Sequence, residues 1–272
     1  GMEHANPWDR EDEHSRLSAR YFRRTFPLAS EVKRATLHIC GLGLYEAYID
    51  GSLISKGTKN DLSRIGDIVM TPAPTDYRKS IIYNTFDITP LLQNDRSKHC
   101  IAVTVSNGRF YTMQQNKKKH KITNFGYPCL RANIIIEYSD GKTETIATDD
   151  KLWRLNADGA IRSANEYDGE IYDARKQFGG SAKAWTSPDF DDSSWQLAQR
   201  SAIPSGSLIG NLTPPMRILD TLRVKHSSTI GNAIVMDFGQ NYAGWTRINT
   251  AACRLSKGDT LRIRYAERLN AD

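Results

Sequence analysis

The sequence lacks the features that mark membrane, metal-binding and nucleotide-binding proteins. It has no long apolar run, which excludes a membrane-spanning helix. Its four cysteines are far apart and its six histidines show no metal-like spacing, so we expect no metal site. No phosphate-binding loop, dinucleotide-binding fingerprint or nucleophile elbow occurs. We therefore expect no organic cofactor.

Disulfide bonds are not needed to stabilise a chain of this size. Its 272 residues suffice for one large or two medium domains, each with its own hydrophobic core. The hydrophobic share of 39% and the charged share of 25% are those of an ordinary globular protein. Cys40, Cys100 and Cys129 each lie in or next to an apolar strand-like run, which predicts buried free thiols.

Positive charge is in excess, with a formal net charge of +6, but its distribution does not indicate a nucleic-acid partner. The two dense basic runs are Arg20 to Arg24 and Lys117 to Lys121. The second run has neither interleaved aromatic residues nor a recognition helix, and a solvated loop explains it most simply. We expect no nucleic-acid partner and no membrane partner. The polar residues after Gly1-Met2 show no signal peptide, which leaves the compartment open.

Short alternating stretches recur after an irregular leader, residues 1–18, and predict β-strands. The predicted strands are 21–26, 34–40, 44–49, 80–88, 99–105, 130–138 and 143–147. Asp50-Gly51 and Asp140-Gly141 are hairpin turn signals, and Thr89 to Leu92 predicts one helical turn with Pro90 near its start. Because no longer helix is predicted, residues 19–178 indicate an all-β fold, an antiparallel β-sandwich.

The rest of the chain divides into a connection and a second strand set. Residues 179–215 are rich in glycine and proline and predict loops, with a turn at Phe190 to Trp195 that packs Trp195 inward. Residues 216–272 predict strands at 219–224, 233–238, 244–249 and 260–265. Four strands are few for an independent sandwich, so we expect the start of a second β-sandwich domain. Its unpaired edge makes a homodimer possible.

The first polar segment, Tyr167 to Arg175, concentrates carboxylates where a strand should end. Asp168, Glu170 and Asp173 could supply the paired carboxylates of a glycosidase, although Asp173 would lie on the opposite face of an extended strand. In a structural alternative, Asp168 and Asp173 accept backbone amides while Arg175 pairs with Glu170. A sugar-contacting or domain-docking role is the third possibility.

The second polar segment, Asp237 to Trp245, combines amides, a carboxylate and aromatic rings. Asp237, Gln240 and Asn241 could hydrogen-bond to sugar hydroxyls while Tyr242 or Trp245 stacks on a pyranose. The structural alternative is a tight loop, favoured by Gly239 and Gly244, in which Asp and Asn bind the chain's own amides. The candidate substrate-binding residues of both segments are Asp168, Glu170, Asp173, Arg175, Asp237, Gln240, Asn241 and Trp245.

Five motifs in order resemble the N-terminal half of bacterial α-L-rhamnosidases, glycoside hydrolase family 78. They are Arg23 to Phe26, Gly41 to Gly51, Tyr83 to Thr89, Tyr167 to Arg175 and Asp237 to Trp245. The resemblance extends over roughly residues 19 to 270, and its most diagnostic parts are Gly169 to Arg175 and Asp237 to Asn241. It implies a jelly-roll-like N-terminal sandwich followed by the start of a second β-domain.

The same resemblance implies that the reaction lies elsewhere. Members of that family hydrolyse terminal α-L-rhamnosides with inversion, on carboxylates of a helical α/α toroid that does not fit in this chain. The resemblance therefore assigns no catalytic residue here, and predicts a non-catalytic region whose partners are the parent's catalytic domain and a rhamnose-containing glycan. Two alternatives stay open: a free-standing carbohydrate-binding module, and a sandwich that is itself catalytic. Calcium is possible, although no dense acidic loop supports it.

Overall fold

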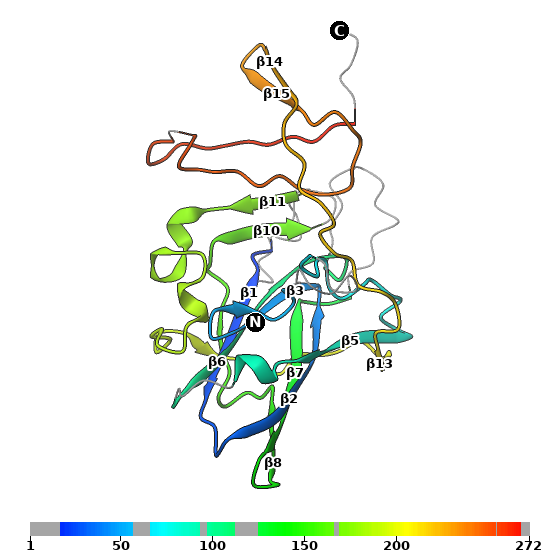
Figure 1. The fold of residues 1–272 in the computed structure, drawn as a ribbon, viewed down its shortest axis with the longest axis vertical. Helices are drawn as coiled ribbons and strands as arrows, with labels where there is room; N and C mark the ends of the chain where they lie inside the picture. Colours follow the sequence, from blue (N-terminus) through cyan, green and yellow to red (C-terminus); the bar gives the residue numbers. More distant parts are fainter. Residues whose placement is uncertain are drawn as a thin grey trace. The chain divides into compact units, whose positions relative to one another are not determined.

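The computed structural model describes residues 17–56, 66–92, 97–111, 125–165, 169–253 and 255–267. Contacts divide the chain into two units, Gly1–Leu219 and Asp220–Asp272, and each is described by itself. The elements are β-strands with a few one-turn 3-10 helices (Figure 1). Within the described ranges, no helix is long and apolar enough to cross a membrane.

The first unit is built on two sheets. The six-stranded sheet has the order β12-β9-β1-β6-β3-β4, and the five-stranded sheet has the order β13-β5-β2-β7-β8. The strands are β1 (Arg20–Phe26), β2 (Val32–Leu42), β3 (Leu44–Ile49), β4 (Ser52–Leu53), β5 (Ser80–Asp87), β6 (His99–Ser106), β7 (Cys129–Tyr138), β8 (Thr143–Ala147), β9 (Arg154–Asn156), β12 (Gln196–Leu197) and β13 (Ser207–Gly210). The pairing of β13 with β5 is parallel and the other pairings in these sheets are antiparallel.

The seven strands predicted for residues 21–147 are confirmed, each within two residues at both ends. Asp50 and Gly51 have φ angles of 48° and 82°, as a type I′ turn requires, and they join β3 to β4. The Asp140-Gly141 turn joins β7 to β8, and Thr89–Leu91 forms the predicted helical turn, η3. The all-β prediction is therefore correct in this unit, and the parallel pairing of β13 with β5 departs from a purely antiparallel pattern.

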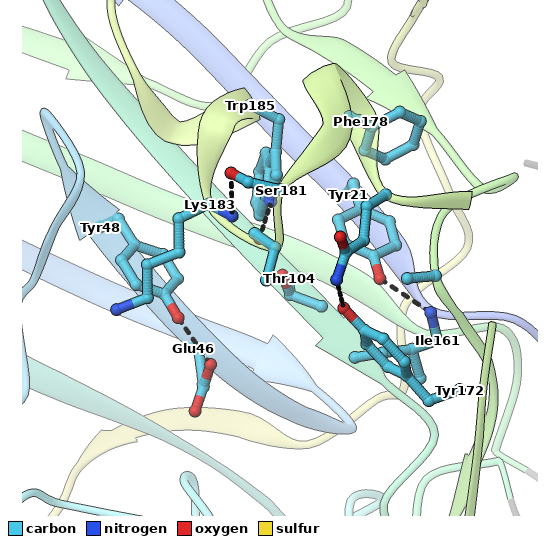
Figure 2. Close-up of a pocket in the computed structure, with 13 residues that line it drawn as sticks. Tyr21, Glu46, Tyr48, Thr104, Ile161, Tyr172, Phe178, Ser181, Lys183 and Trp185 are labelled. Atoms are coloured by element: carbon cyan, nitrogen blue, oxygen red, sulfur yellow. Dashed lines mark hydrogen bonds between the residues drawn. The ribbon is translucent and has the colours of Figure 1, made fainter. Parts of the chain in front are cut away.

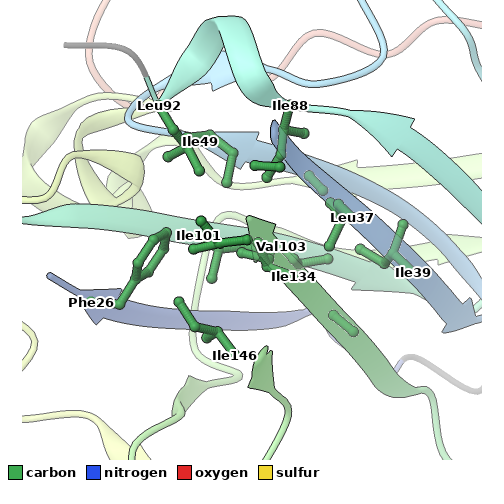
Figure 3. Close-up of a cluster of buried hydrophobic side chains, with 14 of the residues drawn as sticks. Phe26, Leu37, Ile39, Ile49, Ile88, Leu92, Ile101, Val103, Ile134 and Ile146 are labelled. Carbon is green, nitrogen blue, oxygen red and sulfur yellow. The ribbon is translucent and has the colours of Figure 1, made fainter. Parts of the chain in front are cut away.

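The main hydrophobic core lies between the two sheets (Figure 3). Every second side chain of a strand points into this layer, because successive side chains of a strand point to opposite faces of the sheet. Ala47 and Ile49 of β3 and Ile101 and Val103 of β6 are at most 1% exposed. From the five-stranded sheet, the core takes Leu37, Ile39, Ile134, Ile136 and Ile146.

The outer face of the six-stranded sheet is covered by a segment rich in aromatic residues. This cover, residues 174–195, contains η5 (Ala174–Lys176), η6 (Phe178–Gly180) and η7 (Ala184–Thr186). Trp185 and Trp195 are 2% and 4% exposed, and they pack with Tyr21, Tyr48 and Ala102 of the sheet. Trp195 donates its amide to the Asp192 carbonyl at 2.9 Å, so the predicted inward turn is confirmed.

A fully buried arginine makes several hydrogen bonds between this cover and the sheet. Arg23 of β1 is 0% exposed, and its guanidinium donates to the carbonyls of Trp185 (3.0 Å), Phe190 (3.3 Å) and Ser187 (2.8 Å). It also forms an ion pair with Asp192. One side chain thus satisfies four acceptors of a segment that has no long strand or helix of its own.

Residues 179–215 also complete the two sheets. β12 pairs with β9 at the edge of the six-stranded sheet, and β13 pairs with β5 at the edge of the other. The segment expected as a loop-rich connection therefore contributes one short edge strand to each sheet. β10 (Ile161–Asn165) and β11 (Gly169–Tyr172) form a separate antiparallel pair.

The second unit contains fewer strands than expected. β14 (His226–Ile230) and β15 (Ala233–Asp237) form a hairpin, which confirms the strand predicted at 233–238. The predicted strand at 219–224 is wrong, because pairing begins only at His226, and residues 244–249 and 260–265 are not strands either. Alternation favours an extended backbone, but a strand also needs a hydrogen-bonded neighbour.

The thiol predictions hold for two of three cysteines. All four cysteines are free; Cys40 and Cys100 are buried, Cys129 is partly buried and Cys253 is exposed. Burial raises the pKa of the Cys40 thiol to about 12 and that of the Cys100 thiol to about 11. These thiols are protonated at neutral pH and act as core side chains.

Replacing the buried arginine should loosen the cover and the sheet together. Arg23→Met leaves Asp192 and three carbonyls without their donor, and loss of one partner of a buried pair costs about 3–5 kcal/mol. We expect a loss of this size in the free energy of unfolding by urea denaturation, and a smaller loss in Asp192→Asn. The exposed Arg34→Met is the control and should change the free energy by less than about 0.5 kcal/mol. Equal effects of Arg23→Met and Arg34→Met would contradict the anchoring role.

Candidate functional site

Part of the first polar segment forms β11 and the start of the cover. Glu170 lies on β11 opposite Ala164, and its side chain is exposed. Surrounding protein that displaces part of its water, and then the nearby Glu46 carboxylate, raise the pKa of Glu170. Asp168 lies outside the described residues.

Asp173 has a structural role that the sequence predicted in part. Its Oδ1 accepts the Arg175 amide at 3.0 Å and caps η5, as the structural alternative required. The same carboxylate accepts two guanidinium hydrogen bonds from Arg175, each 2.8 Å long. The predicted pairing of Arg175 with Glu170 is therefore wrong. Arg175 pairs with Asp173 instead, because the Asp173 carboxylate is two residues away, is already held in place by the cap and can accept two hydrogen bonds from the guanidinium. These contacts lower the pKa of Asp173 to about 2.

Next to this segment, a pocket opens between the six-stranded sheet and the cover (Figure 2). Its volume is about 250 Å³. Strands β1, β3 and β6 form one wall, residues 160–161 and Tyr172 form another, and residues 177–185 of the cover close the third. The lining residues are Tyr21, Glu46, Tyr48, Thr104, Ala160, Ile161, Tyr172, Gln177, Phe178, Ser181, Ala182, Lys183 and Trp185.

Aromatic rings make up much of the pocket wall, and they hold one another in place. Tyr21 meets Trp185 and Phe178 edge-on, with ring centroids 5.1 and 5.2 Å apart. Tyr48 meets Trp185 at 6.4 Å. The Trp185 indole donates to the Ala182 carbonyl at 3.1 Å, and the Tyr21 hydroxyl accepts the Ile161 amide at 3.0 Å. The rings are therefore fixed by hydrogen bonds as well as by packing.

Polar groups lie at two places in the pocket. At the first, the Tyr48 hydroxyl donates to Glu46 Oε2 at 2.7 Å, and Lys183 Nζ lies 5.4 Å from the centre of the Tyr48 ring. Burial, and then the Glu46 carboxylate, raise the pKa of Tyr48, so its hydroxyl stays a donor. At the second, Gln177 Nε2 donates to the Tyr172 hydroxyl at 2.7 Å. In Figure 2 the Glu46 carboxylate lies beyond the Tyr48 hydroxyl, and the Lys183 side chain lies over the Tyr48 ring.

None of these lining residues was predicted as a site residue from the sequence. Glu46 and Tyr48 are two apart on β3 and so share its outer face, which is a signal that alternation offers. Nothing local indicates that Lys183 and Trp185, more than 130 positions later, cover that face. Of the predicted residues, Glu170 lies near the pocket, as its interaction with Glu46 shows.

The predicted residues of the second segment lie in the second unit. Asp237 ends β15, and its Oδ1 accepts the Gly239 amide at 2.6 Å, while Gly239 has a φ of 76°. The structural alternative of a tight loop is thus correct for Asp237. The Trp245 side chain is 53% exposed. Gln240 and Asn241 are exposed as well, and sugar contact by these residues stays a prediction.

Within the described parts of the chain, no three His, Cys, Asp or Glu side chains group as a metal site would require. The two packed sheets and the side pocket define the class of this chain as an all-β sandwich domain. Two family models match it: residues 30–220 match the alpha-L-rhamnosidase N-terminal domain, and residues 227–272 match the bacterial alpha-L-rhamnosidase concanavalin-like domain. The chain therefore belongs to the alpha-L-rhamnosidase N-terminal domain family.

Individual relatives agree with this assignment. An alpha-L-rhamnosidase of Streptomyces avermitilis is 34% identical over 98% of this chain and 24% of its own length, and one of Formosa agariphila is 32% identical over 86% and 23%. The solved alpha-L-rhamnosidase of Dictyoglumus thermophilum is 35% identical, with a TM-score of 0.69 over 84% of this chain and 23% of that one. The chain thus spans about a quarter of the length of these relatives.

The Asp173–Arg175 pair gives a titration that can be measured directly. Carboxyl carbon NMR should show Asp173 titrating near pH 2. Because the folded pKa is lowered, the pair stabilises the fold above the ordinary value of 3.8, and this stabilisation is lost as pH falls through about 2. In Arg175→Met the pKa of Asp173 should rise toward 3.8, whereas that of Asp191, lowered by Ser193, should not change. An unshifted Asp173 in this variant would show that Arg175 is not its partner.

Proposed function

We propose that this chain is the non-catalytic β-region of an enzyme that hydrolyses terminal α-L-rhamnosides, and that it supports a catalytic domain supplied by the rest of that enzyme. The observation that carries the proposal is the share of the related enzymes that this chain matches. Family models for two β domains account for residues 30–220 and 227–272, while the chain spans about a quarter of the alpha-L-rhamnosidases it resembles. Its partners are then the catalytic domain and a rhamnose-containing glycan.

The carboxylates of the first polar segment support a non-catalytic role. A glycosidase needs one free carboxylate to activate water or attack the sugar and one acid to protonate the leaving oxygen. Both oxygens of Asp173 accept hydrogen bonds from Arg175, and the lowered pKa of Asp173 keeps it from acting as the acid. Among the described carboxylates of this segment, Glu170 is therefore left without a second one that is free to act.

We assign the sandwich of the first unit to the jelly-roll-like type and keep carbohydrate binding as a property to be tested. One solved relative, the alpha-L-rhamnosidase of Streptomyces avermitilis, is described as complexed with L-rhamnose; it is 29% identical, with a TM-score of 0.69 over 84% of this chain and 20% of its own. A free-standing carbohydrate-binding module is the alternative, but no observation favours it over a region of a larger enzyme. A homodimer through an unpaired edge is likewise a proposal.

Hydrolysis of an aryl α-L-rhamnoside separates these roles. The purified 272-residue chain should show no turnover above the uncatalysed rate, and any longer product of the same gene should be active. In that longer product, Glu170→Gln and Asp173→Asn should retain kcat within about tenfold, because loss of a general acid or base costs about 10²–10⁴-fold.

Two results would overturn this proposal. Turnover by the short chain that disappears in Glu170→Gln would place the chemistry in the sandwich. A longer product that folds but does not act on rhamnosides would remove the proposed activity. Lys33→Ala, an exposed change on β2, is a suitable control for both proteins.

A further inference from the structure

We propose that the pocket between the six-stranded sheet and the cover binds a single neutral sugar ring. The proposal concerns this region alone and holds whether or not a catalytic domain accompanies it. It assigns Glu46, Lys183 and Gln177 as the groups that bind hydroxyls, and the aromatic wall of the pocket, in which the Tyr172 ring is 44% exposed, as the surface against which the sugar lies.

The size of the pocket restricts the ligand. Pockets for drug-sized molecules usually measure roughly 300–1,000 Å³. The volume here, about 250 Å³, is below that range and is many times the roughly 30 Å³ share of one water. One six-membered ring fits such a space, whereas an oligosaccharide would extend outside it.

The wall suits a ligand with a flat apolar face. A pyranose has such a face, formed by its C–H groups, and aromatic side chains offer the complementary surface. The Tyr172 ring is the exposed part of this wall and is held by the hydrogen bond from Gln177 to its hydroxyl, while the buried rings of Tyr48 and Trp185 make the rest of the wall rigid. Trp185 is fixed by its hydrogen bond to Ala182 and by the Arg23 guanidinium on its carbonyl, and Tyr48 by its hydrogen bond to Glu46. Little conformational freedom is then lost on binding.

The polar groups suit a neutral ligand that both donates and accepts hydrogen bonds. Among the described residues, Lys183 Nζ contacts only the Tyr48 ring, one Glu46 oxygen has no donor, and Gln177 Oε1 has none. Hydroxyl groups can satisfy all three. An anion such as phosphate would be repelled by Glu46 and the nearby Glu170, and a simple cation would be repelled by Lys183.

Titration of the full 272-residue chain with sugars tests the site. L-rhamnose, D-glucose, D-galactose and sodium phosphate are each added to tens of millimolar, with binding followed by Trp fluorescence and by calorimetry. We expect saturation by at least one sugar, and none by phosphate. Lys183→Ala and Glu46→Gln should each weaken that sugar about tenfold or more, since hydrogen bonds to charged groups contribute about 1.5–3 kcal/mol.

Matched controls keep the test specific. Lys33→Ala and Glu31→Gln make the same chemical changes at exposed positions on or beside β2, away from the pocket lining, and should bind the sugar as the unchanged chain does. Urea denaturation of all four variants should show that each is folded. Failure of every sugar to saturate would overturn the proposal. So would sugar binding that survives both pocket variants, or saturation by phosphate. None of these results depends on hydrolysis, which tests the proposed function separately.

Discussion

In the first unit, the buried cation Arg23 holds the cover on the six-stranded sheet. Arg23 comes from the middle of the six-stranded sheet, and its guanidinium meets three carbonyls and one carboxylate of the cover. Removing a guanidinium from water is costly unless each donor finds an acceptor. Arginine suits this position because its planar, permanently charged group presents five donors in a fixed geometry. The cover has only one-turn helices, so this set of contacts takes the place of regular secondary structure.

The aromatic packing and the pocket follow from this attachment. Once residues 185–192 are held on the sheet, Trp185 and Trp195 can bury their rings against the outer face of β1, β3 and β6. The sheet is then apolar on both faces, with the main core on one side and the cover on the other. Where the cover begins, directly after β11, the remaining space is the pocket. The Gly169–Arg175 motif lies beside it, with Asp173 and Arg175 fixing the start of the cover.

The sequence allowed prediction of those features that depend on neighbours in the chain. Alternation located β2, β6 and β7, and the Asp50-Gly51 and Asp140-Gly141 turns located two hairpins. The role of Asp173 as a cap was also predictable, because a cap is a local interaction.

Features that depend on distant parts of the chain were not predictable in this way. Arg23 was noted as part of a basic run and of a family motif but not as an anchor, since its acceptors lie more than 160 residues later. The parallel pairing of β13 with β5 was missed for the same reason, because the two segments are far apart in the sequence and meet only in the folded chain. The same holds for the pocket groups Glu46 and Lys183. In the second unit, extended segments without a described partner were predicted as strands.

Amide hydrogen exchange tests the central claim most directly, because it compares the opening of the cover with that of the sheet. If Arg23 makes them one cooperative unit, the Trp195 amide, bonded to the Asp192 carbonyl, should exchange with a free energy within about 1 kcal/mol of the Val103 amide in β6. Exchange of Trp195 through an opening several kcal/mol easier, while Val103 stays protected, would contradict the account. The cover would then detach from the sheet without unfolding of the sheet, and the pocket between them would open at the same time.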